Sequence, residues 1–283
     1  MCIGIRSRAR RVLALTPFVL IAFWRAEACA QNSAVIEVDL ELVLAVDISR
    51  SMNPREMEIQ RQGYKAALVD DAVLAAISRG YLGQIAVTYM EWAEAEHQRI
   101  VVDWTLIRDK RDAEAFVARM QPTRLPNLRL TSISHAIDQA VALIVTNDYS
   151  APRQVIDISG DGPSNDGRTI TFARDDAVAR GVTINGLPLM TREGVGGAWY
   201  LDDLDIYYKL CVIGGPDAFV LPVHDWADFP DAVRRKLLLE LSSKTPPPHL
   251  TARPARFQHA AARDRYDCRI TDAVWGPTWW YRR

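Results

Sequence analysis

The order of hydrophobic and polar residues changes along the chain, and each change predicts a different element. Residues 36–47 begin as a strict alternation and become a continuous apolar run from Leu42 to Val46, which Asp47 ends. Alternation is typical of a half-exposed strand, and a continuous run is typical of a strand buried on both faces, as in a parallel sheet. Between Ile133 and Ile144 the apolar residues instead recur every three or four positions, which predicts an amphipathic helix.

Strand-like and helix-like segments follow one another through most of the sequence. Further strands are predicted at 84–92, 98–104, 153–159, 182–189 and 218–223. Further helices are predicted at 54–77, 109–120, 169–180, 204–213 and 229–241. Because strands that alternate with helices favour a mostly parallel sheet covered on both faces, the sequence predicts a Rossmann-like, doubly wound α/β fold. We expect a six-stranded sheet in the order 3-2-1-4-5-6, with 98–104 as a short antiparallel edge strand.

The N-terminal residues differ from the rest in both charge and hydropathy. A basic stretch with four arginines between Arg6 and Arg11 is followed by an apolar run over 12–24 and by the small residues of Ala28-Cys29-Ala30. This is the three-part plan of a secretory signal peptide, which predicts cleavage after residue 30. The apolar run is shorter than the roughly 20 residues that a membrane span needs, although an uncleaved anchor is the alternative. We therefore expect a periplasmic or secreted protein with no stable membrane insertion after cleavage.

The C-terminal part contains a linker-like stretch and one of two remaining cysteines. Four prolines lie between Thr245 and Pro254, and tryptophan and arginine are frequent in the residues that follow. The sequence thus divides into a signal peptide (1–30), a globular domain (31–244) and an extension (245–283). Cys211 and Cys268 would be the two cysteines left after cleavage, and in an oxidising compartment they form a candidate disulfide. Two unpaired buried thiols remain the alternative.

The overall charge argues against one class of partner. The formal net charge is -1 and the pI is about 6.5. Non-specific binding to nucleic acid depends on a basic surface, so we expect no nucleic-acid partner. The sequence does not indicate an oligomeric state.

Oxygen-bearing side chains follow the predicted strands where each strand ends. Asp47, Ser49 and Ser51 come directly after the buried strand, Asp161 lies between two glycines after strand 153–159, and Thr131 precedes the amphipathic helix. Open parallel sheets bind ligands at the carboxyl edge of their strands. Carboxylates and hydroxyls are hard ligands that suit Mg²⁺, Mn²⁺ or Ca²⁺ better than zinc. Serine at the start of a helix is also a common N-cap, so the Asp47–Ser51 loop alone does not indicate a metal site. The prediction depends on the three loops taken together.

At these residues the sequence resembles the von Willebrand factor A (integrin inserted-domain) superfamily. The resemblance rests on Asp47-Ile-Ser-Arg-Ser51-Met, on Thr131, and on Ile158-Ser-Gly-Asp161-Gly, and it covers about residues 36–242. Within the superfamily the chain is most similar to an uncharacterised exported bacterial family. The resemblance implies a metal-ion-dependent adhesion site (MIDAS). Ser49 and Ser51 would then bind the ion directly and Thr131 would do so when a ligand is bound, whereas Asp47 and Asp161 would act mainly through water.

These observations predict a non-enzymatic module that captures an Asp or Glu carboxylate of a partner protein at a bound Mg²⁺, Mn²⁺ or Ca²⁺. No catalytic residue is predicted, since the sequence has neither a His-Glu-x-x-His motif nor a Walker phosphate loop. A metal-assisted hydrolase with His135 as proton shuttle is one alternative. A structural envelope protein with a vestigial metal site is another.

Overall fold

The computed structural model describes residues 35–122, 128–191, 200–242 and 266–270. The predicted signal peptide, the proline-rich linker and the tryptophan-rich end of the extension lie outside the described residues. Among the residues described, no helix is both long and apolar enough to cross a bilayer.

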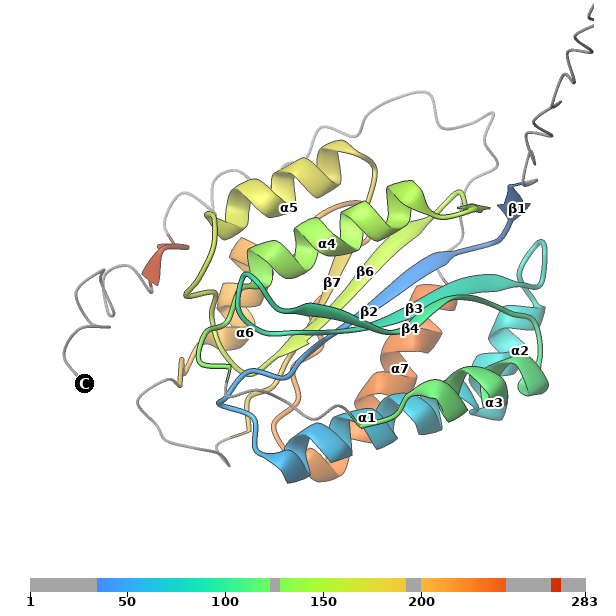
Figure 1. The fold of residues 1–283 in the computed structure, drawn as a ribbon, viewed down its shortest axis with the longest axis horizontal. Coiled ribbons are helices and arrows are strands. Elements are labelled where there is room, and N and C mark those ends of the chain that lie inside the picture. Colours follow the sequence, from blue (N-terminus) through green and yellow to red (C-terminus); the bar gives the residue numbers. More distant parts are fainter. Residues whose placement is uncertain (1–34, 123–127, 192–199, 243–265, 271–283) are drawn as a thin grey trace, which may run out of the picture. The chain divides into compact units, whose positions relative to one another are not determined.

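The centre of the fold is a five-stranded sheet with the order β4-β3-β2-β6-β7 (Figure 1). Its strands are β2 (Glu41–Asp47), β3 (Ile85–Trp92), β4 (Gln98–Ile107), β6 (Gln154–Gly160) and β7 (Thr183–Pro188). All neighbours are parallel except β3 and β4, which form an antiparallel hairpin. A separate two-stranded parallel sheet joins β1 (Ile36–Glu37) to β5 (Tyr149–Ser150). The predicted order of the first five strands is therefore confirmed.

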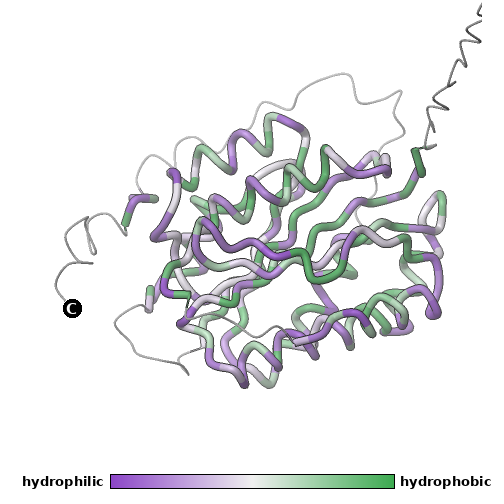
Figure 2. The backbone as a smooth tube through the Cα atoms, viewed as in Figure 1, coloured by the Kyte–Doolittle hydropathy of each residue, from purple (hydrophilic) through white to green (hydrophobic). Residues whose placement is uncertain are grey.

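Helices cover both faces of the sheet, as Figure 1 shows. One face carries α1 (Pro54–Leu68), α2 (Asp71–Ser78), α3 (Lys110–Arg119) and α7 (Phe229–Ser242). The other carries α4 (Ile133–Thr146), α5 (Ile170–Ala179) and the short α6 (Leu204–Tyr207). In Figure 2 the helices carry both hydrophilic and hydrophobic stretches, as expected of helices with one buried face. The predicted doubly wound α/β fold is confirmed.

The central strand β2 contributes to two hydrophobic cores. Its residues are all buried; Leu42, Leu44 and Val46 point into the core under α1 and α7, while Val43 and Ala45 point into the core under α4 and α5. Successive side chains of a strand point to opposite faces, so the middle of a strand between two helical layers favours apolar residues at every position, and the two buried acids of β2, Glu41 and Asp47, stand at its ends. This explains the continuous apolar run that ends at Asp47.

The predicted sixth strand is wrong. The segment 218–223 runs beside β7 but makes only isolated parallel bridges, Gly186 with Val220 and Leu189 with Val223. Leu221 and Val223 donate their N–H groups to the carbonyls of Gly186 and Pro188, but Pro188 in β7 has no N–H to donate in return, so the ladder is interrupted there. The sheet therefore has five strands rather than six.

Three other elements differ from their predicted extents. The helix expected over 54–77 is two helices, because the Asp70 side chain accepts the backbone N–H groups of Ala72 and Val73 and caps a new helix. The edge strand β4, expected to be short, extends to Ile107. The strand expected over 36–47 is divided into β1 and β2.

A charged cluster is buried between β6 and α7. The Lys236 Nζ lies 2.5 Å from Asp157 Oδ1 and 2.9 Å from Glu240 Oε1, and all three side chains are fully buried. Burial raises the pKa of Asp157 to about 7 although Lys236 lowers it. Burial lowers the pKa of Lys236, but the two carboxylates outweigh it and raise that pKa overall. One cation facing two carboxylates favours a cluster in which one acid retains its proton near neutral pH.

Candidate metal centre

Two strand ends place the predicted acidic residues side by side. β2 ends at Asp47 and β6 ends at Gly160, directly before Asp161. The two strands are parallel neighbours, with Val46 opposite Ser159. The loops that follow β2 and β6 therefore leave the sheet at the same edge, as the predicted topology required.

Hydrogen bonds link four of the five predicted site residues. The Ser49 backbone N–H donates to Asp47 Oδ1 at 2.7 Å. The hydroxyls of Ser49 and Ser51 are 3.0 Å apart, and the Ser51 hydroxyl donates to Asp161 Oδ1 at 2.6 Å. Two hydroxyls and two carboxylates thus form one contiguous group of hard oxygen atoms.

Thr131 reaches the same edge through backbone contacts. Its N–H donates to Asn165 Oδ1 and its carbonyl accepts the Asn165 N–H, both at 2.8 Å. The next residue, Ser132, donates its N–H to the carbonyl of Ala93, which directly follows β3. In the described part of the chain the Thr131 hydroxyl makes no hydrogen bond to the other four site residues. Asn165, in the loop after Asp161, was not among the predicted site residues.

Helix α1 stabilises the Asp47–Ser51 loop through its N-cap and one side-chain hydrogen bond. The Asn53 side chain accepts the N–H groups of Arg55 and Glu56, and Glu56 Oε2 accepts the N–H of Asn53, which together form a capping box. One turn further, Gln60 Nε2 donates to the backbone carbonyl of Asp47 at 3.0 Å. Gln60 is buried and was not predicted to contribute to the site.

Both carboxyls of the site have raised pKa values. Burial raises the pKa of Asp47 from 3.8 to about 8, and the nearby Asp161 adds to this rise. Burial also raises the pKa of Asp161 to about 6. The hydrogen bond from Ser51 lowers this pKa, and the charge of Glu56 raises it. Asp47 is buried and Asp161 is half-buried, and two acids this close together disfavour each other's ionisation unless a positive charge joins them.

Among the described residues, one carboxylate oxygen of Asp47 has no hydrogen-bond partner. This atom, Oδ2, is fully buried, and so is the hydroxyl of Tyr208, for which the described part of the chain also provides no partner. Both lie against Gly160: a side-chain carbon there would come within 2.8 Å of the Tyr208 hydroxyl and 2.9 Å of Asp47 Oδ2. Buried polar atoms are rarely left unsatisfied, so this position suits an additional polar or cationic group.

The donor set fits a hard divalent cation. Its atoms are carboxylate and hydroxyl oxygens, which Mg²⁺, Mn²⁺ and Ca²⁺ accept and which zinc accepts less readily. Within the described ranges, no three His, Cys, Asp or Glu side chains gather into a metal-binding group. The candidate site has only two acids, so a bound ion would keep much of its positive charge.

His135, the proton shuttle of the hydrolase alternative, is engaged elsewhere. Its Nδ1 lies 2.9 Å from the hydroxyl of Ser132, which is fully buried and donates to the carbonyl of Asp166 at 3.0 Å. The ring also packs against Gly167, where a side-chain carbon would lie 2.2 Å from Nδ1. In the described structure, these contacts show that His135 stabilises the loop that follows β6.

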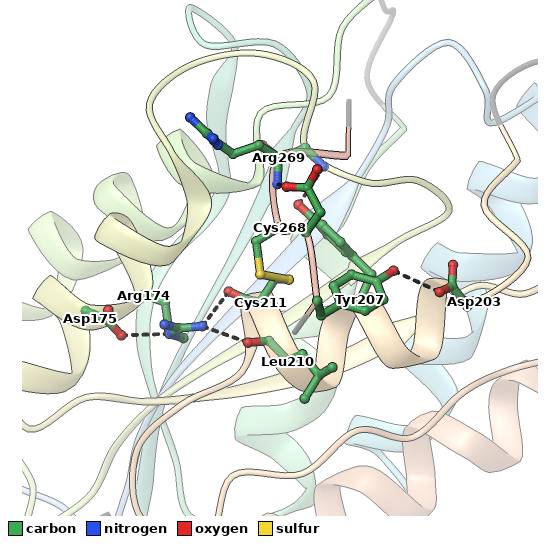
Figure 3. Close-up of a disulfide and its surroundings, with 11 residues drawn as sticks. Arg174, Asp175, Asp203, Tyr207, Leu210, Cys211, Cys268 and Arg269 are labelled. Atoms are coloured by element: carbon green, nitrogen blue, oxygen red, sulfur yellow. Dashed lines mark hydrogen bonds and ion pairs between the residues drawn. A yellow bond between two sulfur atoms is a disulfide. The ribbon is translucent and has the colours of Figure 1, made fainter. Parts of the chain in front are cut away.

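Figure 3 shows a disulfide on the helical segment that carries Tyr207 and Leu210. Cys211 and Cys268 are joined, which confirms the candidate disulfide. Cys211 belongs to a π-helical turn, Tyr208–Val212, that directly continues α6. The preceding Tyr207 accepts the backbone N–H of Ser164, in the loop after Asp161, at 3.2 Å. The helix that holds the disulfide thus also contacts two sides of the candidate site.

Comparisons with known proteins agree with the fold. A family model described as "Protein of unknown function (DUF1194)" matches residues 37–245, most of the chain. No curated protein matches the sequence.

The solved structures with a similar fold include the following three. The pilus adhesin SpaC from Lactobacillus rhamnosus GG, in its open conformation, has a TM-score of 0.51 and 11% identity over 72% of this chain and 30% of that chain. Proximal thread matrix protein 1 from the mussel byssus has a TM-score of 0.51 and 13% identity over 72% and 47% of the two chains. A von Willebrand factor type A protein from Catenulispora acidiphila has a TM-score of 0.49 and 14% identity over 71% and 42%.

This chain spans less than half the length of each of these three proteins, and at such identities the likeness concerns the fold alone. The match to the family model extends from the first described strand past the last described helix. The mixed α/β fold, a central sheet flanked by helices, is shared with the two structures that have a TM-score of 0.51, and the chain belongs to the DUF1194 family of proteins of unknown function.

Proposed function

We propose that this protein is an exported, metal-ion-dependent binding module of the adhesion type, which captures an acidic group of a partner protein. The observation that carries the proposal is the continuous group of oxygens formed by Ser49, Ser51 and Asp161, next to the unpartnered Oδ2 of Asp47. The edge of the sheet at which these atoms meet is the usual place for a ligand in an open α/β fold.

The ion would be Mg²⁺, with Mn²⁺ or Ca²⁺ as alternatives. Ser49 and Ser51 would bind it directly, Asp47 and Asp161 would act mainly through water, and Thr131 would join when a ligand is bound. The two neighbouring acids, whose pKa values are raised, favour a cation between them. Because few carboxylates would touch the ion directly, it would stay electrophilic and attract an external Asp or Glu carboxylate.

Two observations support a location outside the cytoplasm, periplasmic or secreted. The first is the signal-like sequence of residues 1–30. The second is the Cys211–Cys268 disulfide, since disulfides persist mainly in oxidising compartments. We further propose that residues 31–244 form the binding domain and that 245–283 form an extension fastened to it by Cys268.

The similar structures add a coarser argument. SpaC is a pilus adhesin, and the mussel byssus protein has been solved with zinc in its MIDAS motif. Proteins that share this fold therefore include ones that attach to other molecules. For this chain, the proposed metal and partner are inferred from its own residues and not from those proteins.

Calorimetry of the purified full chain with Mg²⁺ and Mn²⁺ tests the site. The double variant Ser49→Ala/Asp161→Ala removes one hydroxyl and one carboxylate from it. We expect metal affinity to fall at least about tenfold, since both groups lie in the proposed oxygen set. The matched control is Ser78→Ala/Asp71→Ala, which removes the same groups from exposed positions on α2. Equal affinity of the site variant and the wild type would show that the site is wrongly assigned.

The partner is tested by capture from a cell-envelope extract in Mg²⁺ and in chelator. The proposal expects a protein that is retained only with Mg²⁺ and that is released by millimolar acetate, a free carboxylate. Retention that is unchanged by chelator, and unchanged in the site variant, would contradict metal-dependent capture.

A further inference from the structure

Two exposed arginines border the proposed metal centre from adjacent loops. Arg50 lies between Ser49 and Ser51, the two proposed direct ligands. Arg129 lies two residues before Thr131, the ligand proposed to join when a partner is bound. We propose that this arginine pair binds a second acidic side chain of the partner, so that the protein recognises a segment with two Asp or Glu residues rather than a single carboxylate. This inference rests on the proposed function and makes its partner more specific.

A backbone hydrogen bond joins the two loops that carry the arginines. The Arg50 N–H donates to the carbonyl of Leu128, the neighbour of Arg129, at 2.9 Å. That carbonyl belongs to the peptide bond between Leu128 and Arg129, so the backbone nitrogens of the two arginines lie within about 5 Å of each other. Their side chains therefore start from neighbouring points, and a single carboxylate can contact both.

The fold does not use either guanidinium group. Within the described ranges, no hydrogen bond or ion pair involves the side chain of Arg50 or Arg129, and both side chains are exposed. Arg168, by contrast, lies 2.6 Å from both Asp138 and Asp176. Two neighbouring cations without a counterion repel each other, and an anion between them removes that repulsion. The arginine pair is therefore suited to an anion from outside the chain.

Two acids near these loops are already bonded to other groups. Glu94 Oε2 accepts the backbone N–H of Arg129 at 3.3 Å, and Glu94 Oε1 lies 3.3 Å from His97 Nδ1. Asp166 Oδ2 accepts the backbone N–H of Ala95 at 2.7 Å. Both carboxylates thus stabilise the loop backbone, and neither forms an ion pair with the arginine pair in the described structure.

A carboxylate of the same partner is the anion that fits best. The planar guanidinium group of arginine binds carboxylates through two parallel hydrogen bonds. A nucleic acid would need a wider basic surface than one pair of arginines, and the whole chain has a formal net charge of -1. The partner already provides one Asp or Glu to the ion under the proposed function, so a second acid in the same segment would be held next to the pair.

The position of Arg50 specifies the spacing of the two acids. Consecutive Cα atoms are about 3.8 Å apart and an extended arginine side chain is roughly 6–7 Å long, so the guanidinium group can reach a carboxylate about 6–10 Å from the ion. Alternate residues of an extended peptide lie about 6.6 Å apart and point to the same side. The expected motif is therefore two acids separated by one residue.

Calorimetry of the full chain in Mg²⁺ tests the pair with three tripeptides, each acetylated and amidated at its ends. Asp-Gly-Asp has two acids, Asp-Gly-Asn has one and Asn-Gly-Asn has none. We expect the wild type to bind Asp-Gly-Asp at least about fivefold more tightly than Asp-Gly-Asn, and Asn-Gly-Asn not at all. A preference of about fivefold exceeds the roughly twofold statistical advantage of a second carboxylate. This comparison uses the wild type alone and so does not depend on the folding of any variant.

Two double variants then assign the preference to the arginines. Arg50→Gln/Arg129→Gln removes both charges and is expected to bind the two acidic peptides with equal affinity, within the statistical factor. The matched control is Arg79→Gln/Arg180→Gln, which removes two exposed arginines at the C-terminal ends of α2 and α5. The control is expected to keep the wild-type preference.

The inference and the proposed function fail separately. If both acidic peptides bind the wild type equally and only in Mg²⁺, the arginine pair is overturned and metal-dependent capture stands. If Asp-Gly-Asp is preferred equally in Mg²⁺ and in chelator, and the preference is lost in Arg50→Gln/Arg129→Gln, the pair stands and metal-dependent capture fails. A preference that persists in that variant, or no binding of any peptide up to about 10 mM, would also overturn the pair.

Discussion

The metal-free protein is expected to become more stable when Asp47 is replaced by asparagine. Asp47 is fully buried, one of its carboxylate oxygens has no partner, and its pKa is raised to about 8. Asp47→Asn preserves the size of the side chain and the oxygen that accepts the Ser49 N–H. It removes the ionisable group that the fold must otherwise bury.

The magnitude follows from the pKa difference between folded and unfolded chain. A folded-state pKa of about 8 against 3.8 means that the folded protein binds this proton more tightly, so stability falls as pH rises from about 4 to about 8. At pH 7 the difference spans about three pH units, or roughly 4 kcal/mol at about 1.4 kcal/mol per unit. We expect Asp47→Asn to raise the free energy of unfolding by about 2–4 kcal/mol, hence Tm by roughly 5–15 °C.

Thermal unfolding followed by circular dichroism at pH 7 measures this effect, in chelator and in Mg²⁺. Mg²⁺ is expected to raise the Tm of the wild type, because a ligand that binds only the folded state stabilises it. Asp47→Asn should have the higher Tm in chelator and a much smaller response to Mg²⁺. The control Asp39→Asn, at a residue that accepts the N–H groups of Leu82 and Gln84 away from the site, should keep the wild-type response.

Two results would refute this reasoning. If Asp47→Asn lowers Tm in chelator, the buried carboxylate is satisfied by contacts that do not need a cation. If the variant responds to Mg²⁺ as strongly as the wild type, the ion binds elsewhere.

Three further substitutions have defined outcomes. Lys236→Met leaves two buried carboxylates without a cation, so we expect the free energy of unfolding measured in urea to fall by about 3–5 kcal/mol. The control Lys110→Met removes an exposed ion pair and should lower the free energy of unfolding by less than about 1 kcal/mol. Gly160→Ala places a carbon against the Tyr208 hydroxyl and Asp47 Oδ2, so calorimetry should show Mg²⁺ affinity at least about tenfold weaker; unchanged affinity would exclude this pocket as part of the site. Cys268→Ser opens a loop of 57 residues and should lower the free energy of unfolding by up to about 4 kcal/mol, an effect that reducing agent should reproduce in the wild type and not in the variant.

The parts of the fold that depend on periodicity were predictable from the sequence. The middle of β2 is buried on both faces and was visible as the apolar run from Leu42 to Val46, and helix α4 was visible from its spacing. The break between α1 and α2 was missed because the helical pattern continues across it and only the Asp70 cap interrupts the backbone. The sixth strand was overestimated because its pattern is strand-like, while Pro188 of the neighbouring strand β7 lacks the N–H that the ladder requires.

The candidate site was predictable only where its residues follow strands directly. Asp47 and Asp161 each stand at the end of a recognisable strand, so topology alone brought them together. Tyr208 and Gln60 were missed, since each reaches the site from a helix whose packing the sequence pattern does not specify. The role of the five predicted residues as metal ligands stays a prediction.

The hydrogen bond from Ser51 to Asp161 joins residues 110 positions apart. Contacts of such sequence separation form late in folding, because the loop between them must close before they contribute. A partly folded chain that had built only its first helices and hairpin would lack Asp161, one of the four hydrogen-bonded residues of the site. An ion, or a fluorescent lanthanide in its place, would therefore bind these oxygens only after β6 has paired with β2. Its binding during refolding would serve as a kinetic marker for completion of the sheet.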